Sequence, residues 1–214
     1  MAMDRSSTLQ IDAYFDLICP WCWIGKAHLN TARRQLAERM PEVQLNVRWH
    51  SVRLIPQVPP QGWPYQAFYE HRLGGPDAVR ARRAQVQAAA SQAGLVIHHE
   101  KIAVFPNTWR AHRLLSLAEP LGTDTHEALL DKLYDSYFVQ GLNIGDDTVL
   151  EQLAQALGLG LSNADDLDAP PIWHPPEGAS GVPLFVFNQQ QAISGAQPPD
   201  VLLSAMLQTL QACV

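Results

Sequence analysis

The chain has 214 residues, of which 47% are hydrophobic and 17% are charged, and its formal net charge is -6 at pH 7. This composition indicates a globular protein and excludes a disordered one. The negative charge argues against a nucleic-acid partner, because a phosphate-binding surface needs a basic field.

The N-terminal residues show no export signal. Residues 1–7 include Asp4 and Arg5 and contain no apolar run of signal-peptide length. No stretch approaches the roughly 18 uninterrupted apolar residues of a membrane span. We therefore expect a cytoplasmic protein without a membrane partner, on the premise that the chain begins at its native terminus.

The first fifty residues predict a strand, a helix and a second strand. Residues 11–16 and 43–49 alternate apolar and polar side chains, which is typical of strands. Residues 20–40 between them are compatible with a helix. Pro20 suits its first turn, where the missing N–H is not needed, and Pro41 ends it. This order is a βαβ unit.

The middle of the chain predicts a group of helices. Residues 55–64, with four prolines and a glycine, indicate a loop. Beyond this loop the spacing of apolar residues is helical to about residue 159, and Thr148 with Glu151 fits a capping box. The clearest helical segments are 78–93, 107–119 and 126–139.

The C-terminal part returns to strands. Residues 161–180 contain two Pro-Pro pairs, which disfavour a regular helix. The apolar run 184–187, a turn at 188–191 and a second short strand at 192–195 predict a hairpin. A last helix follows Pro198. The sequence therefore predicts a small α/β sheet domain that is split by a helical insert.

The segment Cys19-Pro20-Trp21-Cys22 lies where the first strand meets the first helix. Two cysteines at this spacing can close a small redox-active ring. The positive end of the helix dipole favours a thiolate on Cys19. In a reducing compartment, such a pair is more often catalytic or metal-binding than structural.

Zinc is the alternative ligand for this pair. A structural zinc site needs four ligands, and the chain has only one other cysteine, Cys213, which we expect to be an incidental free thiol. His98 and His99 are adjacent rather than spaced as a chelate. The sequence therefore predicts no metal site, although one assembled from distant ligands stays open.

Together these features resemble the thioredoxin fold, and more closely the DsbA-like oxidoreductases with a helical insertion. The nearest match is the FrnE-like branch, related to hydroxychromene-carboxylate isomerases and kappa-class glutathione transferases. Five blocks carry the resemblance in the family's order: 16–26, 107–115, 137–144, 181–186 and 194–197.

The resemblance implies an α/β, thioredoxin-like fold interrupted by an all-helical insert. Residues 9–58 and 171–214 would form the thioredoxin-like domain, and residues 59–170 the insert. The family usually has a helix where this chain has the proline-rich segment 161–180. We therefore expect one wall of the active site to be missing or rebuilt.

The activity implied by the resemblance is thiol–disulfide exchange on protein or small-molecule disulfides. Cys19, the more exposed cysteine, would attack as a thiolate, and Cys22 would resolve the mixed disulfide. The first cysteine of such motifs has a pKa of roughly 3.5–7.5. Pro20 and Trp21 would tune its surroundings. No bound cofactor is implied, and glutathione would be a redox partner.

Pro183 is, by resemblance, the cis-proline of the fold, with Val182 against the cysteine pair. Only about 5–6% of X–Pro bonds in folded proteins are cis, so this prediction is sharp. A trans proline that opens an edge strand is the alternative.

Asn107 and His112 match an insert motif that lies near the active-site cleft in the glutathione-using relatives, which implies a substrate-binding role. Their chemistry alone equally fits a helix N-cap and a helix-face residue. Many thioredoxin-fold enzymes bury an acidic residue where this chain has Ala13. Asp12 or Asp16 could replace it as a proton relay, or both could be ordinary strand positions or local caps.

Two other functions stay open. In the glutathione-dependent isomerases and transferases, a serine replaces the nucleophilic cysteine, so the intact pair argues against that activity. The second is a non-catalytic ligand-binding module or a metal-binding chaperone. The redox direction and the oligomeric state do not follow from the sequence.

Overall fold

The computed structural model describes residues 8–159 and 181–212. The chain divides into two compact units, one formed by Met1–Val52 with Trp173–Val214 and the other by Arg53–Ile172. We call the first the sheet unit and the second the helical unit, and describe each by itself. None of the described helices is both long and apolar enough to cross a bilayer.

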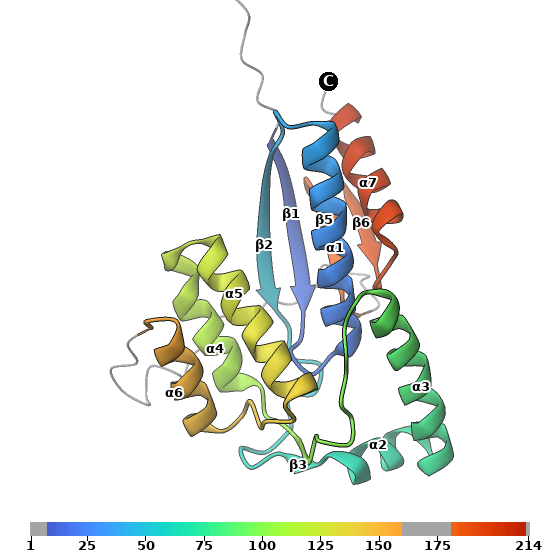
Figure 1. The fold of residues 1–214 in the computed structure, drawn as a ribbon, viewed down its shortest axis with the longest axis vertical. Coiled ribbons are helices and arrows are strands. Elements are labelled where there is room, and N and C mark those ends of the chain that lie inside the picture. Colours follow the sequence, from blue (N-terminus) through green and yellow to red (C-terminus); the bar gives the residue numbers. More distant parts are fainter. Residues whose placement is uncertain (1–7, 160–180, 213–214) are drawn as a thin grey trace, which may run out of the picture. The chain divides into compact units, whose positions relative to one another are not determined.

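The sheet unit contains a four-stranded mixed sheet in the order β2-β1-β5-β6 (Figure 1). The central strand β1 runs parallel to β2 and antiparallel to β5, and β5 forms a hairpin with β6. The strand bounds are Thr8–Phe15 for β1, Gln44–Ser51 for β2, Leu184–Phe187 for β5 and Gln191–Ser194 for β6. The predicted strands and hairpin are therefore present.

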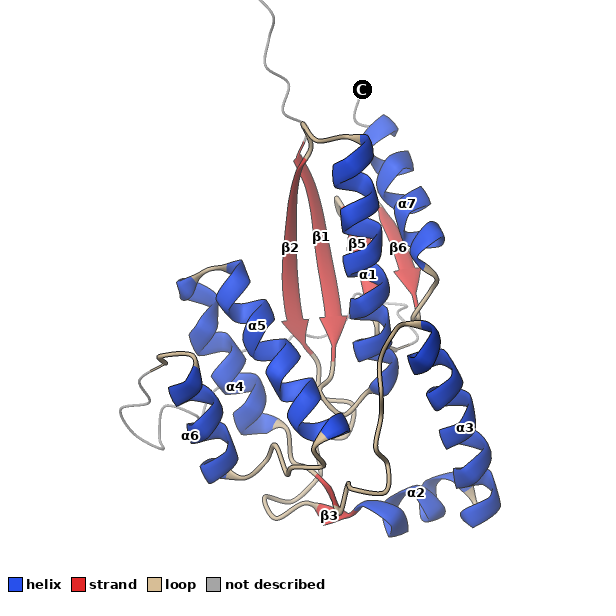
Figure 2. Ribbon diagram, in the orientation of Figure 1, coloured by secondary structure: helices blue, strands red, loops and turns tan. Residues whose placement is uncertain are grey.

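Two helices, α1 (Pro20–Arg39) and α7 (Pro199–Ala212), pack side by side over one face of this sheet (Figures 1 and 2). The alternation in β1 explains this packing, because every second side chain points to the helices. These inward side chains, Leu9, Ile11, Ala13 and Phe15, are at most 1% exposed. Burying such a side chain contributes about 1.5–3 kcal/mol, so the start of α1 is anchored on a firm core.

The helical unit holds the insert. Its helices are α2 (Tyr65–Leu73), α3 (Pro76–Gln92), α4 (Trp109–Ala118), α5 (Thr123–Tyr134) and α6 (Asp147–Ala156), with a 3₁₀ turn at Glu119–Leu121 and a π-helical turn at Asp135–Val139. Two short strands, β3 (Trp63–Pro64) and β4 (Val104–Phe105), pair antiparallel. The mixed α/β fold with a helical insert is thus confirmed.

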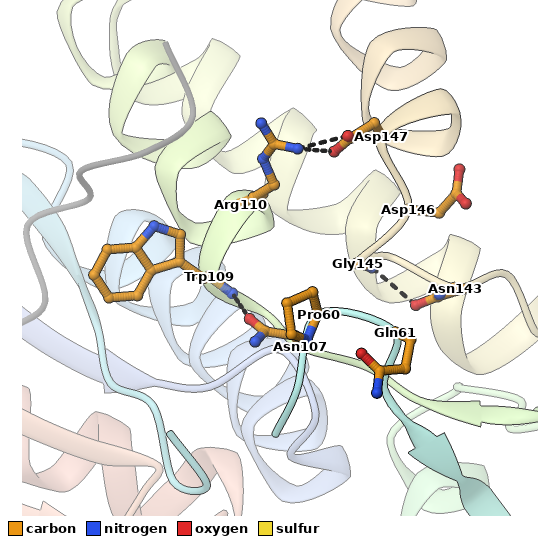
Figure 3. A pocket seen from close by; sticks show the side chains of 9 residues that line it. All are labelled: Pro60, Gln61, Asn107, Trp109, Arg110, Asn143, Gly145, Asp146 and Asp147. Atoms are coloured by element: carbon orange, nitrogen blue, oxygen red, sulfur yellow. Dashed lines mark hydrogen bonds and ion pairs between the residues drawn. The ribbon is translucent and has the colours of Figure 1, made fainter. Parts of the chain in front are cut away.

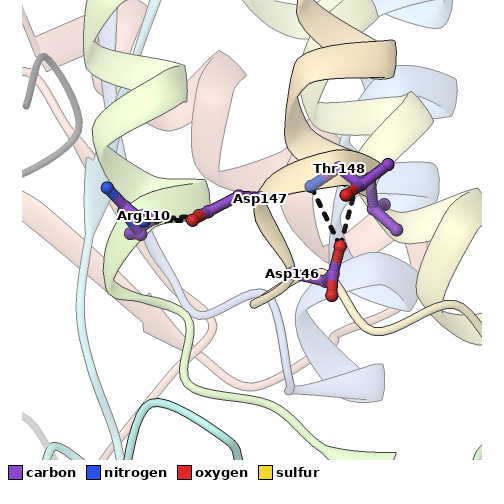
Figure 4. Close-up of polar contacts among 5 residues, drawn as sticks. Arg110, Asp146, Asp147 and Thr148 are labelled. Atoms are coloured by element: carbon purple, nitrogen blue, oxygen red, sulfur yellow. Dashed lines mark hydrogen bonds and ion pairs between the residues drawn. The ribbon is translucent and has the colours of Figure 1, made fainter. Parts of the chain in front are cut away.

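The N-cap of α6 is Asp146, so the capping box predicted at Thr148 is wrong (Figure 4). Oδ1 of Asp146 accepts hydrogen bonds from the backbone N–H groups of Thr148 at 2.9 Å and Val149 at 3.4 Å. A carboxylate satisfies free N–H groups and also interacts favourably with the helix dipole. The helix therefore begins earlier, and Thr148 falls inside its first turn.

A polar cluster in the helical unit joins α2, α3 and the segment before β4. A hydrogen bond of 2.9 Å joins the hydroxyl of Tyr65 and Nδ1 of His99, and the Arg83 guanidinium lies 5.2 Å from the Tyr65 ring centroid. Burial and the charge of Arg83 lower the pKa of His99 to about 4, and burial raises the pKa of Tyr65 to about 12. Both groups are therefore neutral at pH 7.

We expect His99 to make the protein less stable in mild acid. Its pKa is 6.5 in an ordinary environment and about 4 in the folded chain, so the unfolded chain binds a proton that the folded chain excludes. The free energy of unfolding should fall as the pH drops from 6.5 to 4, by on the order of 1–2 kcal/mol because solvent screens this partly buried group.

Urea unfolding of the wild type and a His99→Gln variant at pH 7 and pH 4.5 tests this expectation. The variant should lose less stability between the two pH values, because glutamine does not titrate. Equal losses in the two proteins would show that other groups account for the pH dependence.

Candidate active site

Cys19 and Cys22 lie at the N-terminal end of α1. Cys19 is the N-cap residue with an extended backbone, and its carbonyl accepts a hydrogen bond from the N–H of Cys22 at 3.0 Å. The N–H of Cys19 in turn donates to the carbonyl of Asp16 at 3.2 Å, which closes the turn between β1 and α1. The helix therefore carries both cysteines on its first turn.

The two cysteines are reduced thiols in different environments. Cys19 is 7% exposed and Cys22 is 1% exposed, so Cys19 is the more accessible one. Burial raises the pKa of Cys22 well above its ordinary value, and a hydrogen bond with the Cys19 side chain raises it further. Cys22 is thus held as a protonated thiol in contact with Cys19.

Val182 and Pro183 lie against Cys19, as the resemblance implied. The Cys19 thiol donates to the Val182 carbonyl at 3.8 Å, and the Val182–Pro183 bond is cis, so the trans alternative is wrong. Pro183 is buried, and its carbonyl accepts a hydrogen bond from the N–H of Gly195 at 2.8 Å. The segment before β5 is therefore fixed beside the first cysteine.

The residues between the cysteines, Pro20 and Trp21, are both partly exposed. Pro20 is the first residue of α1, the position predicted for it. That these two residues tune the cysteine chemistry stays a prediction.

Gly25 of α1 lies close to Pro183 and Phe185. A Cβ atom on Gly25 would lie 3.0 Å from Cγ of Pro183 and 3.3 Å from Cζ of Phe185. Both contacts are tighter than normal packing, and a proline ring and a buried aromatic ring have little freedom to move aside. Glycine therefore lets the helix pass close to the segment that carries Val182.

We expect a Gly25→Ala variant to be less stable than the wild type. Overpacking costs typically 1–3 kcal/mol, whereas the gain in helix propensity is about 1 kcal/mol, so the net loss should be on the order of 1 kcal/mol. Thermal unfolding measures the effect. A raised melting temperature would show instead that Pro183 and Phe185 relax around the added methyl group.

Two buried charged side chains belong to the same region. Asp16 is 0% exposed and Lys26 is 1% exposed. The negative charge of Asp16 contributes to raising the pKa of Cys22. Lys26 lies four residues after Cys22 and therefore on the same face of α1, with Nζ 5.8 Å from the Trp49 ring centroid. Burying a charged side chain is costly unless other polar groups compensate it. Asp16 and Lys26 therefore make the interior beside the cysteine pair polar.

Of the two acidic residues weighed from the sequence, only Asp16 lies at the cysteine pair. Asp12 remains a strand residue whose Oδ1 lies 2.8 Å from Nε2 of His50. Since β1 ends at Phe15, Asp16 is not part of its alternation and turns inward. The burial of Lys26 on the same face of α1 as Cys22 was not predicted, although its i+4 spacing from Cys22 in the predicted helix was a usable signal.

Asn107 belongs to the helical unit and acts as a local cap. Its Oδ1 accepts a hydrogen bond from the N–H of Trp109 at 2.9 Å, and its Nδ2 donates to the Val58 carbonyl at 2.5 Å. It also lines a cavity of about 700 Å³, one wall of which is the ion pair of Arg110 with Asp147 at 2.5 Å (Figures 3 and 4). The N-cap residue of α4 is Thr108 and not the predicted Asn107, although the Asn107 side chain accepts from the first N–H of the helix; substrate binding stays a prediction.

His112 lies inside α4 and is 1% exposed, so it is a buried residue and not a solvent-facing one. Its backbone N–H donates to the Thr108 carbonyl at 3.0 Å as part of the helix start. A role for His112 in substrate binding also stays a prediction.

The described residues do not provide a ligand set for the alternative that the cysteines bind a metal ion. In residues 8–159 and 181–212, no group of three or more His, Cys, Asp or Glu side chains could hold an ion. Cys213 and the proline-rich segment 161–180 lie outside these ranges.

Comparisons with known proteins agree with the fold. A model of the DSBA-like thioredoxin domain matches residues 10–169. The uncharacterised protein YwbO of Bacillus subtilis (strain 168) is 26% identical over 210 residues, which cover 93% of this chain and 96% of YwbO.

Solved structures extend this comparison. The probable DsbA oxidoreductase SCO1869 from Streptomyces coelicolor has a TM-score of 0.79 and 28% identity, covering 95% of this chain and 90% of its own. The cytosolic disulfide reductase DsbM from Pseudomonas aeruginosa, solved with GSH, has a TM-score of 0.61 and 22% identity, covering 94% and 99%. The likeness to DsbM concerns the fold.

Proposed function

Because this chain belongs to the DSBA-like thioredoxin domain family, we propose that it is a dithiol–disulfide oxidoreductase that acts through Cys19 and Cys22. The observation that carries this proposal is the asymmetry of the pair. Cys19 is the N-cap residue of α1 and is 7% exposed, whereas Cys22 is 1% exposed and its thiol is hydrogen-bonded to the Cys19 side chain. These are the environments that a nucleophile and a resolving group need.

The reduction of a substrate disulfide then takes two exchanges. The Cys19 thiolate attacks one substrate sulfur, the substrate S–S bond breaks, and the released thiolate takes up a proton. Cys22 next loses its proton and attacks the Cys19 sulfur, which breaks the mixed disulfide and releases the second substrate thiol. Two electrons pass to the substrate, and the protein is left with a Cys19–Cys22 disulfide. Substrate oxidation is the reverse sequence.

We propose roles for three groups at this site: the N-terminal end of α1, Asp16 and Val182. The positive end of the α1 dipole lies at Cys19, the residue proposed to attack the substrate. We propose that Asp16, which is fully buried and whose charge acts on Cys22, accepts the proton that Cys22 must lose. The Val182 carbonyl accepts a hydrogen bond from the Cys19 thiol and so orients the sulfur that we propose as the nucleophile.

The substrates that we propose are protein or small-molecule disulfides, with glutathione as a redox partner and no resident cofactor. The structure of DsbM with GSH supports glutathione as a candidate. We also place the chain on the FrnE-like branch, with reductase or isomerase activity in the cytoplasm. The direction depends on the reduction potential against the glutathione pool, where 30 mV is about 1.4 kcal/mol.

Turnover assays in both directions test the proposal. The protein should accelerate the reduction of insulin by dithiothreitol, or the oxidation and reshuffling of reduced ribonuclease, above the uncatalysed rate. A folded protein with both thiols reduced that accelerates neither reaction would exclude the proposed function and would favour a non-catalytic binding module.

A further inference from the structure

The helical unit contains a second cavity, of about 720 Å³, beside α2. Small-molecule sites typically measure about 300–1,000 Å³, so this volume suits a small ligand. One face of α2 and the loop before it form the walls. Its lining includes Ile55, Trp63, Ala67, Phe68, His71 and Arg72.

The apolar wall of this cavity is an aromatic stack. The rings of Trp63 and Phe68 lie 5.6 Å apart with an interplanar angle of 16°. Phe68 in turn contacts Phe105, which is 1% exposed, at a centroid distance of 3.9 Å. The stack is thus anchored in the core of the unit, which gives a preformed surface for a flat apolar group.

The ionisable residues that line the cavity are all basic. His71 and Arg72 are its ionisable lining residues, and no acidic side chain lines it. Neither side chain has an ion-pair or hydrogen-bond partner within the described part of the chain. The acidic residue of α2, Glu70, instead accepts a hydrogen bond from Gln66 at 2.6 Å. The basic lining of this cavity contrasts with the net charge of -6 of the whole chain.

The dipole of α2 explains only part of the position of these two basic residues. Basic residues are favoured in the last turn of a helix, where the dipole is negative, and His71 and Arg72 lie in the last turn of α2. The dipole does not explain why the same face of the helix borders an aromatic cavity. The i, i+4 spacing of Ala67 and His71, and of Phe68 and Arg72, places apolar and basic groups side by side on that face.

We propose that this cavity binds a small aromatic carboxylate, with its ring against Trp63 and Phe68 and its anionic group at Arg72 and His71. No step of thiol–disulfide exchange uses these residues, so the inference goes beyond the proposed function. The cavity lies wholly within the helical unit, and its occupancy can be measured without any cysteine chemistry.

Calorimetric titration of the full chain with 2-naphthoate and with neutral 2-naphthamide tests the proposal. Naphthoate should bind about tenfold tighter than the amide, which corresponds to about 1.4 kcal/mol. An Arg72→Gln variant should lose this tenfold preference. Arg82→Gln is the matched control, because it removes the same charge from α3, where the exposed Arg82 donates a hydrogen bond to Gln85 at 3.1 Å.

A second pair of variants places the test inside the cavity. Ala67 is an exposed lining residue, so both Ala67→Gln and Ala67→Glu should fold. The glutamate variant should weaken naphthoate binding about tenfold more than the isosteric glutamine variant, because it adds a repelling charge. Absent binding, equal affinity for the two probes, or equal effects of Arg72→Gln and Arg82→Gln would overturn the proposal.

Discussion

A Cys22→Ser variant is expected to stop thiol–disulfide exchange after its first step and to accumulate a mixed disulfide between Cys19 and its substrate. Cys19 retains its place at the helix N-cap, so the attack on a substrate disulfide is preserved. The buried sulfur that would release the substrate is gone. Mass spectrometry after incubation with a small aromatic disulfide should show one stable adduct, and turnover should fall to the uncatalysed rate.

The reciprocal Cys19→Ser variant should form no adduct and show no turnover, because Cys22 is 1% exposed and is held as a thiol. Both variants are best made with Cys213→Ser, so that the third cysteine cannot contribute an adduct. An adduct on Cys22 that forms as readily as the one on Cys19 would reverse the assignment of nucleophile and resolving group.

The second large effect should come from Asp16. Cys22 must lose a proton before it attacks, and burial raises the pKa of this thiol well above its ordinary value. Asp16 is a fully buried carboxylate whose charge acts on the same thiol. If it accepts the proton, an Asp16→Asn variant should slow resolution of the mixed disulfide by about 10²-fold or more, the usual contribution of a general base.

The two possible effects of Asp16 have opposite signs, which makes the experiment decisive. Its negative charge opposes formation of a Cys22 thiolate, so a purely electrostatic role predicts faster resolution in Asp16→Asn. Acid quenching followed by mass spectrometry measures the decay of the mixed disulfide directly. Unchanged or faster decay would exclude Asp16 as the proton acceptor.

Asp12→Asn provides the matched control for this experiment. It removes the same charge from the preceding strand, where Asp12 contacts His50 at 2.8 Å. The resolving step should be unchanged in this variant. Circular dichroism of both variants separates a chemical effect from a loss of fold.

The parts of the fold that the sequence predicted are those with a strong local signal. Alternation over six or more residues revealed β1 and β2, and Pro20 and Pro41 bracketed α1. The cis Val182–Pro183 bond followed from the family resemblance rather than from local chemistry. These signals together correctly predict a cysteine pair between a strand and a helix.

The features that the sequence did not reveal depend on tertiary contacts. The pairing of β3 with β4 involves two residues on each strand, which is too short for any alternation to show. Asp146 is the N-cap of α6 because its carboxylate accepts hydrogen bonds from two backbone N–H groups. The burial of Asp16 and Lys26 is set by the surrounding core, because charged side chains are mostly exposed and their apolar sequence neighbours do not show which way they point.

The central claim is that the two sulfurs at the start of α1 interconvert reversibly between a dithiol and a disulfide. Equilibrating the protein with graded ratios of reduced and oxidised glutathione, then quenching, alkylating and weighing it, measures this equilibrium. We predict one two-electron transition, in which the ratio of disulfide to dithiol protein changes tenfold for each change of about 30 mV in the glutathione potential. A pair that stays as two free thiols at every glutathione ratio would contradict the account.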